Sequence, residues 1–145
     1  MLIAAGIGLH NFGEGLAIGG SAATGAIGLA TILVIGFALH NATEGFGITA
    51  PMAGDAERPT WGFLVVMALI AGGPTIAGTA VGRYLTSEAL SVAFLALAAG
   101  SILYVVVQLI KVSARRGHGE LFLVGILAGL ALGVLTDLIV TAGGA

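Results

Sequence analysis

The sequence predicts an all-α protein, a polytopic transmembrane bundle of five spanning helices that forms a single domain over residues 1–145. Apolar residues make up 58% of the chain and charged residues only 8%, whereas a soluble domain carries about 25% charged residues. The mean hydropathy is +1.12. The charges gather between apolar stretches of about 20 residues, the length that crosses a bilayer. The lipid bilayer is therefore the expected environment of this chain.

Five stretches fit spanning helices and are joined by short connections. The helices are expected at about residues 1–23, 27–50, 61–81, 88–110 and 121–141. Small residues at 24–28 would turn the first helix into the second, and a polar loop bounded by prolines would follow at 51–60. Thr86 or Ser87 would cap the fourth helix. The connection at 111–120 is the most basic part of the chain.

Lys and Arg are distributed unequally between the two ends of such a bundle. The loops at 51–60 and 111–120 share one end and hold Arg58, Lys111, Arg115 and Arg116, while the other end has only Arg83. Short loops rich in Lys and Arg remain in the cytoplasm. We therefore expect an integral protein of the cell (plasma or inner) membrane, with both loops in the cytoplasm and the carboxyl terminus outside.

Small residues are spread through the predicted helices, which include most of the 25 glycines. Small residues allow membrane helices to approach each other closely. In the last helix, Gly125, Gly129 and Gly133 follow one another at intervals of four residues. This spacing predicts that the last helix packs tightly against a neighbour, within the chain or between chains.

The pattern HNxxEG occurs twice, at residues 10–15 and 40–45. Residues four apart lie on one face of a helix, so each copy aims an imidazole and a carboxylate in one direction. A turn near residue 27 would bring the two copies to the same depth. One His–Glu pair alone is more often a satisfied pair in the interior, but two facing copies of such costly groups indicate a site. The expected metal ligands are His10, Glu14, His40 and Glu44.

These side chains define the class of metal. Imidazole and carboxylate suit zinc, iron(II) or manganese, whereas calcium requires oxygen ligands. The chain has no cysteine, so a thiolate site is excluded. Asn11 and Asn41 could act as weak ligands or hold the ligands in place. Glycines in the motifs are expected to loosen both helices there. Asp137 and Gln108 are candidate residues of an ion pathway through the membrane, although such residues more often have a structural role, as hydrogen-bond partners between helices or, for Asp137, at the outer interface.

The doubled motif resembles the metal motifs in the fourth and fifth transmembrane helices of the ZIP (Zrt-, Irt-like) metal transporters. The resemblance continues through residues 72–78, which are similar to the sixth helix, and 98–105, which are similar to the seventh. It implies helices four to eight of an eight-helix transporter that carries zinc and related ions toward the cytoplasm. Helices one to three would then be missing. The resemblance also assigns the two His–Glu pairs as primary ligands and the two motif asparagines to a neighbouring second metal.

The chain departs from the ZIP pattern at several positions. Gly13 and Thr43 stand where the family usually has a proline before the motif Glu. Gly73 stands where many members have a Glu, and Gln108 where a Glu is frequent. The loss of these carboxylates favours one bound metal rather than two.

The expected function is therefore transport of a divalent metal, zinc foremost, with iron, manganese or cadmium also suited to the ligands. No GxxxxGK[ST] phosphate-binding motif is present, so transport would be secondary or facilitated rather than driven by ATP. The protein is not expected to be an enzyme. One alternative is an intramembrane metal-dependent hydrolase with Asp137 as its base. Another is a metal-binding half-transporter that acts only with a second chain, for example as a homodimer.

A net charge of −2 without a large basic cluster gives no reason to expect a nucleic acid partner.

Overall fold

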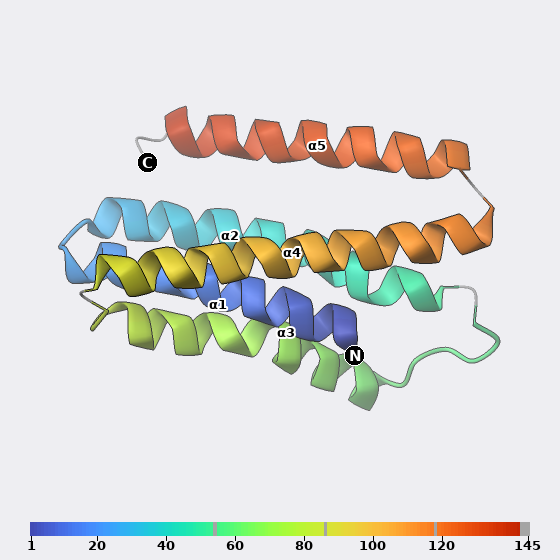
Figure 1. Cartoon of the computed structure of the whole chain (residues 1–145), viewed down its shortest axis with the longest axis horizontal. Helices are drawn as coiled ribbons and strands as arrows, with labels where there is room; N and C mark the ends of the chain where they lie inside the picture. Colours follow the sequence, from blue (N-terminus) through green and yellow to red (C-terminus); the bar gives the residue numbers. More distant parts are fainter. Residues whose placement is uncertain (54, 86, 118, 143–145) are drawn as a thin grey trace.

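Successive helices run in alternating directions along the long axis of a bundle (Figure 1). The computed structural model describes residues 1–53, 55–85, 87–117 and 119–142. The helices are α1 (Leu2–Ala23), α2 (Ile27–Thr49), α3 (Trp61–Gly82), α4 (Glu88–Arg116) and α5 (Gly119–Ala142), and a short 3₁₀ turn, η1 (Ala50–Met52), follows α2. No strand occurs in these ranges. The prediction of an all-α chain with five helices is confirmed.

Local sequence signals explain most helix boundaries. Gly25 adopts a φ of 80° between α1 and α2, a conformation that is open to glycine at little cost. Thr60 caps α3 by accepting a hydrogen bond from the Phe63 amide at 3.2 Å. Ser87 caps α4 in the same way, and the other predicted cap, Thr86, lies outside the described residues. These caps satisfy amides that have no partner within the first helical turn.

The end of α4 differs from the prediction, because the helix continues past residue 110 to Arg116. Lys and Arg are good helix formers, and near a helix C-terminus their charge is favourable. Gly117, with a φ of 74°, then ends the helix in a left-handed conformation. The basic stretch from Lys111 is therefore mostly helical rather than a loop.

Four helices are long and apolar enough to cross a membrane. These candidate spans are Ile27–Met52, Trp61–Gly82, Glu88–Arg115 and Gly119–Ile139. Helix α1 has 22 residues and is about 33 Å long, so its length would suffice. Its composition is less apolar because it holds His10, Asn11 and Glu14 among several glycines.

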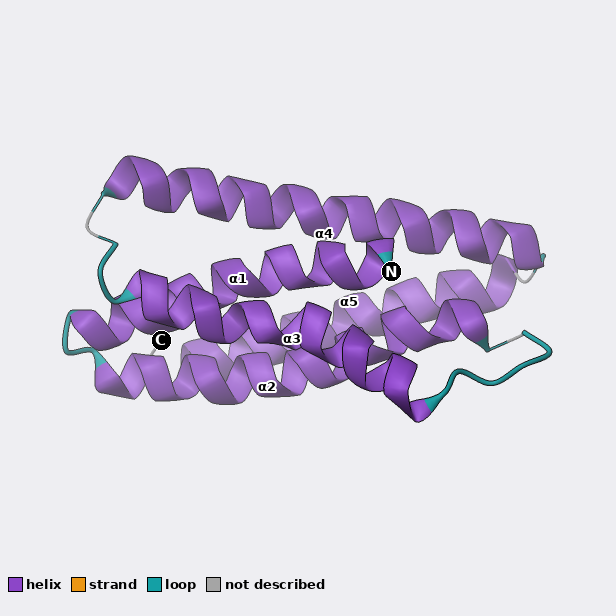
Figure 2. Ribbon diagram, turned by 90° about the horizontal axis from the view of Figure 1, so that it is seen from below, coloured by secondary structure: helices purple, strands orange, loops and turns teal. Residues whose placement is uncertain are grey.

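The position of α1 explains how it can be less apolar than its neighbours. It packs against α2, α3 and α4, and Figure 2 shows it between α4 and α3. Ile7 of α1 packs in the core with Ala71 of α3 and Val105 of α4. Because other helices cover α1, its polar side chains are shielded from the surroundings of the bundle.

Glycines bring α1 and α3 into direct backbone contact. A Cβ atom on Gly15 or Gly19 of α1 would collide with the carbonyl oxygen of Thr75 or Thr79 of α3, respectively. On the facing helix, a Cβ on Gly78 would meet the carbonyl oxygen of Phe12 in the same way. The two helices therefore pack through interlocking small residues, as is common between membrane helices.

Helix α5 lies apart from the rest of the bundle (Figure 1) and has few contacts, which are with α2 and α4. Cβ atoms placed on Gly125, Gly129 and Gly133 would have no atom within 4 Å. The predicted tight packing of this helix is therefore wrong within the chain. Packing between chains stays a prediction.

Candidate metal centre

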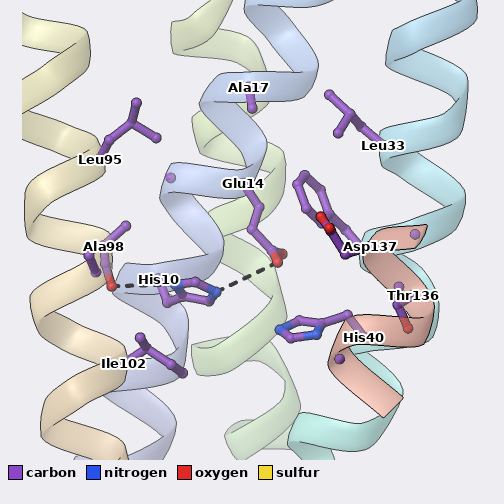
Figure 3. Close-up of a pocket in the computed structure, with 15 residues that line it drawn as sticks. His10, Glu14, Ala17, Leu33, His40, Leu95, Ala98, Ile102, Thr136 and Asp137 are labelled. Atoms are coloured by element: carbon purple, nitrogen blue, oxygen red, sulfur yellow. Dashed lines mark hydrogen bonds and ion pairs between the residues drawn. The ribbon is translucent and has the colours of Figure 1, made fainter. Parts of the chain in front are cut away.

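Three of the four predicted ligands come together between α1 and α2 (Figure 3). One nitrogen or oxygen atom from each of His10, Glu14 and His40 lies within 4.8 Å of the others. His10 Nε2 lies 3.7 Å from Glu14 Oε1. Ligands about 2.1 Å from a tetrahedral metal are about 3.4 Å apart. Small side-chain movements would therefore bring the three atoms onto one ion.

The hairpin of α1 and α2 creates this meeting. The turn at Gly25 lies midway in sequence between His10 and His40, and two helices that run back from such a turn place these residues at similar depths. Within each helix, the interval of four residues brings the Glu onto the face of its His. The spacing of the doubled motif therefore predicts that the three ligands meet.

Helix α4 orients the imidazole of His10. Its Nδ1 atom lies 3.3 Å from the backbone carbonyl oxygen of Ala98. A carbonyl oxygen can only accept a hydrogen bond, so Nδ1 carries the proton and the Nε2 lone pair is left to bind a metal. Metal-binding histidines usually donate their second ring nitrogen in this way. A backbone acceptor leaves no signal in the sequence, and this contact could not have been predicted.

The second His–Glu pair has a more open position. His40 Nε2 lies 3.5 Å from Glu44 Oε1, and the His40 side chain is 46% exposed, against 9% for Glu44. Apart from this contact with His40, the buried Glu44 Oε1 has no hydrogen-bond partner among the described residues. Glu44 lies outside the tight group of three ligands, so its role as a fourth ligand stays a prediction.

Asn41 links the two carboxylates. In the orientation that satisfies its surroundings, its amide nitrogen lies 3.1 Å from Glu44 Oε2 and 3.2 Å from Glu14 Oε2. The amide can donate one hydrogen to each oxygen. Asn41 therefore holds two like charges near each other and leaves the other oxygen of each carboxylate available.

Asn11, the equivalent residue of the first motif, has a different environment. Its side chain is 1% exposed and donates from Nδ2 to the carbonyl oxygen of Ala71 on α3 at 3.1 Å. This contact ties α1 to α3 rather than linking carboxylates. The two copies differ because α1 is enclosed by other helices and α2 is not.

The predicted loosening of the helices at the motifs is wrong. Both α1 and α2 are continuous α-helices through their HNxxEG residues. A Cβ on Gly13 would lie 2.7 Å from the Cβ of Ala98, so this glycine allows α4 to approach α1. Thr43 donates a hydrogen bond from its hydroxyl to the backbone carbonyl oxygen of His40 in the same helix, at 2.6 Å.

A cavity of about 620 Å³ borders the three ligands and is lined by α1, α2, α4 and α5. Most of its lining residues are apolar or small. Asp137 and Thr136 contribute polar groups from α5, on the wall opposite α1 (Figure 3). Gln108, the other predicted pathway residue, is half-buried on α4 and is not among the residues that line this cavity.

Comparison with known proteins assigns the chain to no family. No family model, no curated protein and no solved structure matches the chain. The resemblance to the ZIP transporters therefore rests on the doubled motif and the segments that follow it.

Proposed function

We propose that the protein moves a divalent metal ion across a membrane toward the cytoplasm, with zinc as the first candidate substrate. The observation that carries this proposal is the convergence of His10, Glu14 and His40 from two adjacent helices beside a cavity. All five helices would span the bilayer, with α1 inside the bundle. The ZIP-like order of motifs supports the same function.

The charges of the site suit a dication. Glu14 and Glu44, linked by Asn41, supply two negative charges when both are ionised. One divalent ion would neutralise them, so the loaded site would carry no net charge in a medium where charge is costly. Two neutral imidazoles add nitrogen ligands, which favour zinc and its chemical relatives over calcium or magnesium. Loss of these ligands to protons would help release the ion.

The basic residues support one orientation of the protein in the membrane. Arg58 and the basic end of α4 lie at one end of the bundle, and Arg83 lies at the other, directly after α3. The positive-inside rule would place the first end in the cytoplasm. With transport toward the cytoplasm, the direction that the resemblance to the ZIP transporters implies, metal would then enter from the end that holds Arg83.

Zinc uptake into proteoliposomes loaded with a zinc-sensitive dye tests this proposal. The double variant His10→Ala, His40→Ala is expected to lose uptake and zinc binding, because only carboxylates remain. Glu120→Gln, which changes a charge at the start of α5 outside the cavity lining, serves as the matched control and should transport like the unmodified protein. Unchanged uptake in the double histidine variant would refute the site.

The glycine-lined face of α5, which no other helix covers closely, supports a second candidate function. In this alternative, the protein is a metal-binding half-transporter that acts only with a second chain. A Cβ on Gly125, Gly129 or Gly133 would have no atom of the described residues within 4 Å, although such a stripe usually packs against another helix. The mass of the protein in detergent, measured together with flux, separates the two candidates. Flux from a monomer would exclude the requirement for a second chain.

A further inference from the structure

The glycines and polar residues of α5 gather on one side of the helix. Between residues 121 and 139, these residues are Gly125, Gly129, Gly133, Thr136 and Asp137. At 3.6 residues per turn they fall within about 120° of the helix circumference. Every residue on the rest of the circumference in this range is apolar. We call the side that holds the glycines and the two polar residues the inner side of α5.

The inner side is turned toward the bundle but does not pack against it. Gly133, Thr136 and Asp137 line the cavity of about 620 Å³ that borders the metal ligands. Phe122, on the same side of α5, lines a second cavity of about 340 Å³ between α5 and α4. Cβ atoms on the glycines of the inner side would have no atom of the described residues within 4 Å. Empty space therefore separates α5 from the helices that it faces.

The opposite wall of the larger cavity is suited to close packing. Small residues of α1, α2 and α4 form much of this wall, at Gly13, Ala17, Gly36, Ala98 and Ala99. Small residues on two facing membrane helices allow their backbones to approach closely. Ala99 lies 17 residues before the end of α4 and Thr136 lies 17 residues after the start of α5. Because the two helices are antiparallel, Ala99 and Thr136 lie at the same depth.

A further helix does not fit everywhere between α5 and the bundle. Cα atoms of α5 lie within 8 Å of Cα atoms of both α2 and α4, whereas a helix with its side chains is about 10 Å across. The cavities can therefore be removed only by a movement of α5 itself.

The connection between α4 and α5 contains glycines that permit such a movement. Gly117 ends α4 with a φ of 74°, and Gly119 begins α5. A Cβ on either glycine would meet nothing within 4 Å. Glycine can change its backbone conformation at little steric cost, so neither the conformation nor the packing of these residues holds α5 in its present place.

We propose that α5 closes toward α4 about the glycines of this connection and covers the His10–Glu14–His40 group. The inner side of α5 would then pack on Ala98 and Ala99 and fill the larger cavity. In this structure α5 is open, and the side chains of His10 and His40 are 21% and 46% exposed, respectively. Closure of α5 around a bound metal rests on the proposed function, whereas closure itself does not.

Disulfide formation between α4 and α5 tests closure, because the chain has no native cysteine. Ala99→Cys and Thr136→Cys are introduced together into the full chain, which is reconstituted in lipid vesicles and oxidised with copper phenanthroline. Figure 3 shows Thr136 and Ala98, the neighbour of Ala99, on opposite sides of the cavity, and a disulfide requires Cβ atoms about 4 Å apart. A bond within one chain is therefore expected only if α5 closes.

The control is the pair Ala99→Cys, Leu138→Cys. Leu138 lies at a similar depth on the opposite side of α5 and is exposed, so this pair should form no bond within the chain. If the Thr136 pair also forms none, or is linked only between two chains, closure is wrong.

The reactivity of His40 with diethylpyrocarbonate, measured by mass spectrometry, shows whether the closed helix covers the ligands. His40 should lose most of its reactivity in the disulfide-bonded Thr136 pair and regain it after reduction with a phosphine. Equal reactivity before and after reduction would mean that α5 does not cover the group, and the inference would fail.

Zinc uptake into the same vesicles separates this inference from the proposed function. The disulfide-bonded protein should lose uptake and recover it on reduction. Unchanged uptake with the disulfide in place would contradict a role of closure at the metal group and leave the proposed function intact. If the unmodified chain takes up no zinc, the proposed function fails, and closure is still decided by the disulfide and by His40.

Discussion

His10 of α1 and Ala98 of α4 are 88 residues apart in sequence, yet the imidazole Nδ1 lies 3.3 Å from the Ala98 carbonyl oxygen. The ring is thereby fixed to a helix that supplies no metal ligand of its own. A metal bound to His10, Glu14 and His40 would connect α1, α2 and, through this hydrogen bond, α4.

Metal binding should therefore stabilise the folded bundle. At a free zinc concentration 100 times the dissociation constant, the expected gain is about 2.7 kcal/mol. Thermal unfolding in detergent, followed with and without zinc, measures it as a rise in Tm. The double variant His10→Ala, His40→Ala should show no rise, and a rise equal to that of the unmodified protein would contradict the assignment of the ligands.

The glycines that follow the two motif glutamates should respond differently to the same substitution. Gly15→Ala places a methyl group against the Thr75 carbonyl oxygen, whereas the Cβ of Gly45→Ala meets nothing within 4 Å. Overpacking of this kind costs about 1–3 kcal/mol, while alanine in an open helical position is favourable by up to about 1 kcal/mol. Unfolding of both variants in detergent checks the difference. Equal effects would contradict the close contact of α1 with α3.

Substitution of the two motif asparagines should have different effects, one on metal binding and the other on stability. Asn41→Ala removes the amide that links Glu14 to Glu44 and is expected to weaken zinc binding by about 10- to 100-fold with little change in stability. Asn11→Ala removes the hydrogen bond to the Ala71 carbonyl and should lower the free energy of unfolding by about 1 kcal/mol. Zinc titration and unfolding of both variants provide the readouts. The reverse pattern would mean that the two roles are exchanged.

Acid should weaken metal binding. Imidazole and carboxylate groups bind a metal only after losing their protons, so binding releases protons and its affinity falls as the pH falls. Each proton released changes the affinity by about tenfold per pH unit. Calorimetric titrations in two buffers with different heats of ionisation count the protons released. A pH-independent affinity would contradict binding through His10 and His40.

The sequence alone indicated much of this arrangement, because its main signals are local. The interval of four residues within each motif and the small turn at Gly25 were enough to predict that His10, Glu14 and His40 meet. The different environments of Asn11 and Asn41 could not be predicted, because identical motif positions differ only in the helices that surround them. The Ala98 carbonyl is likewise invisible in a sequence, since every residue carries that acceptor. The end of α4 cannot be predicted from the sequence, because the basic residues after position 110 are compatible with a polar loop and also favour a helix.

In the proposed membrane protein, the position of α1 would have a consequence for insertion into the bilayer. A segment with His10, Asn11 and Glu14 gains less from partitioning into lipid alone than the four more apolar helices do. The glycine surface that it needs lies on α3, which the ribosome makes later. Stable insertion of α1 would therefore wait for α3, and assembly of the metal centre would coincide with completion of the bundle rather than precede it.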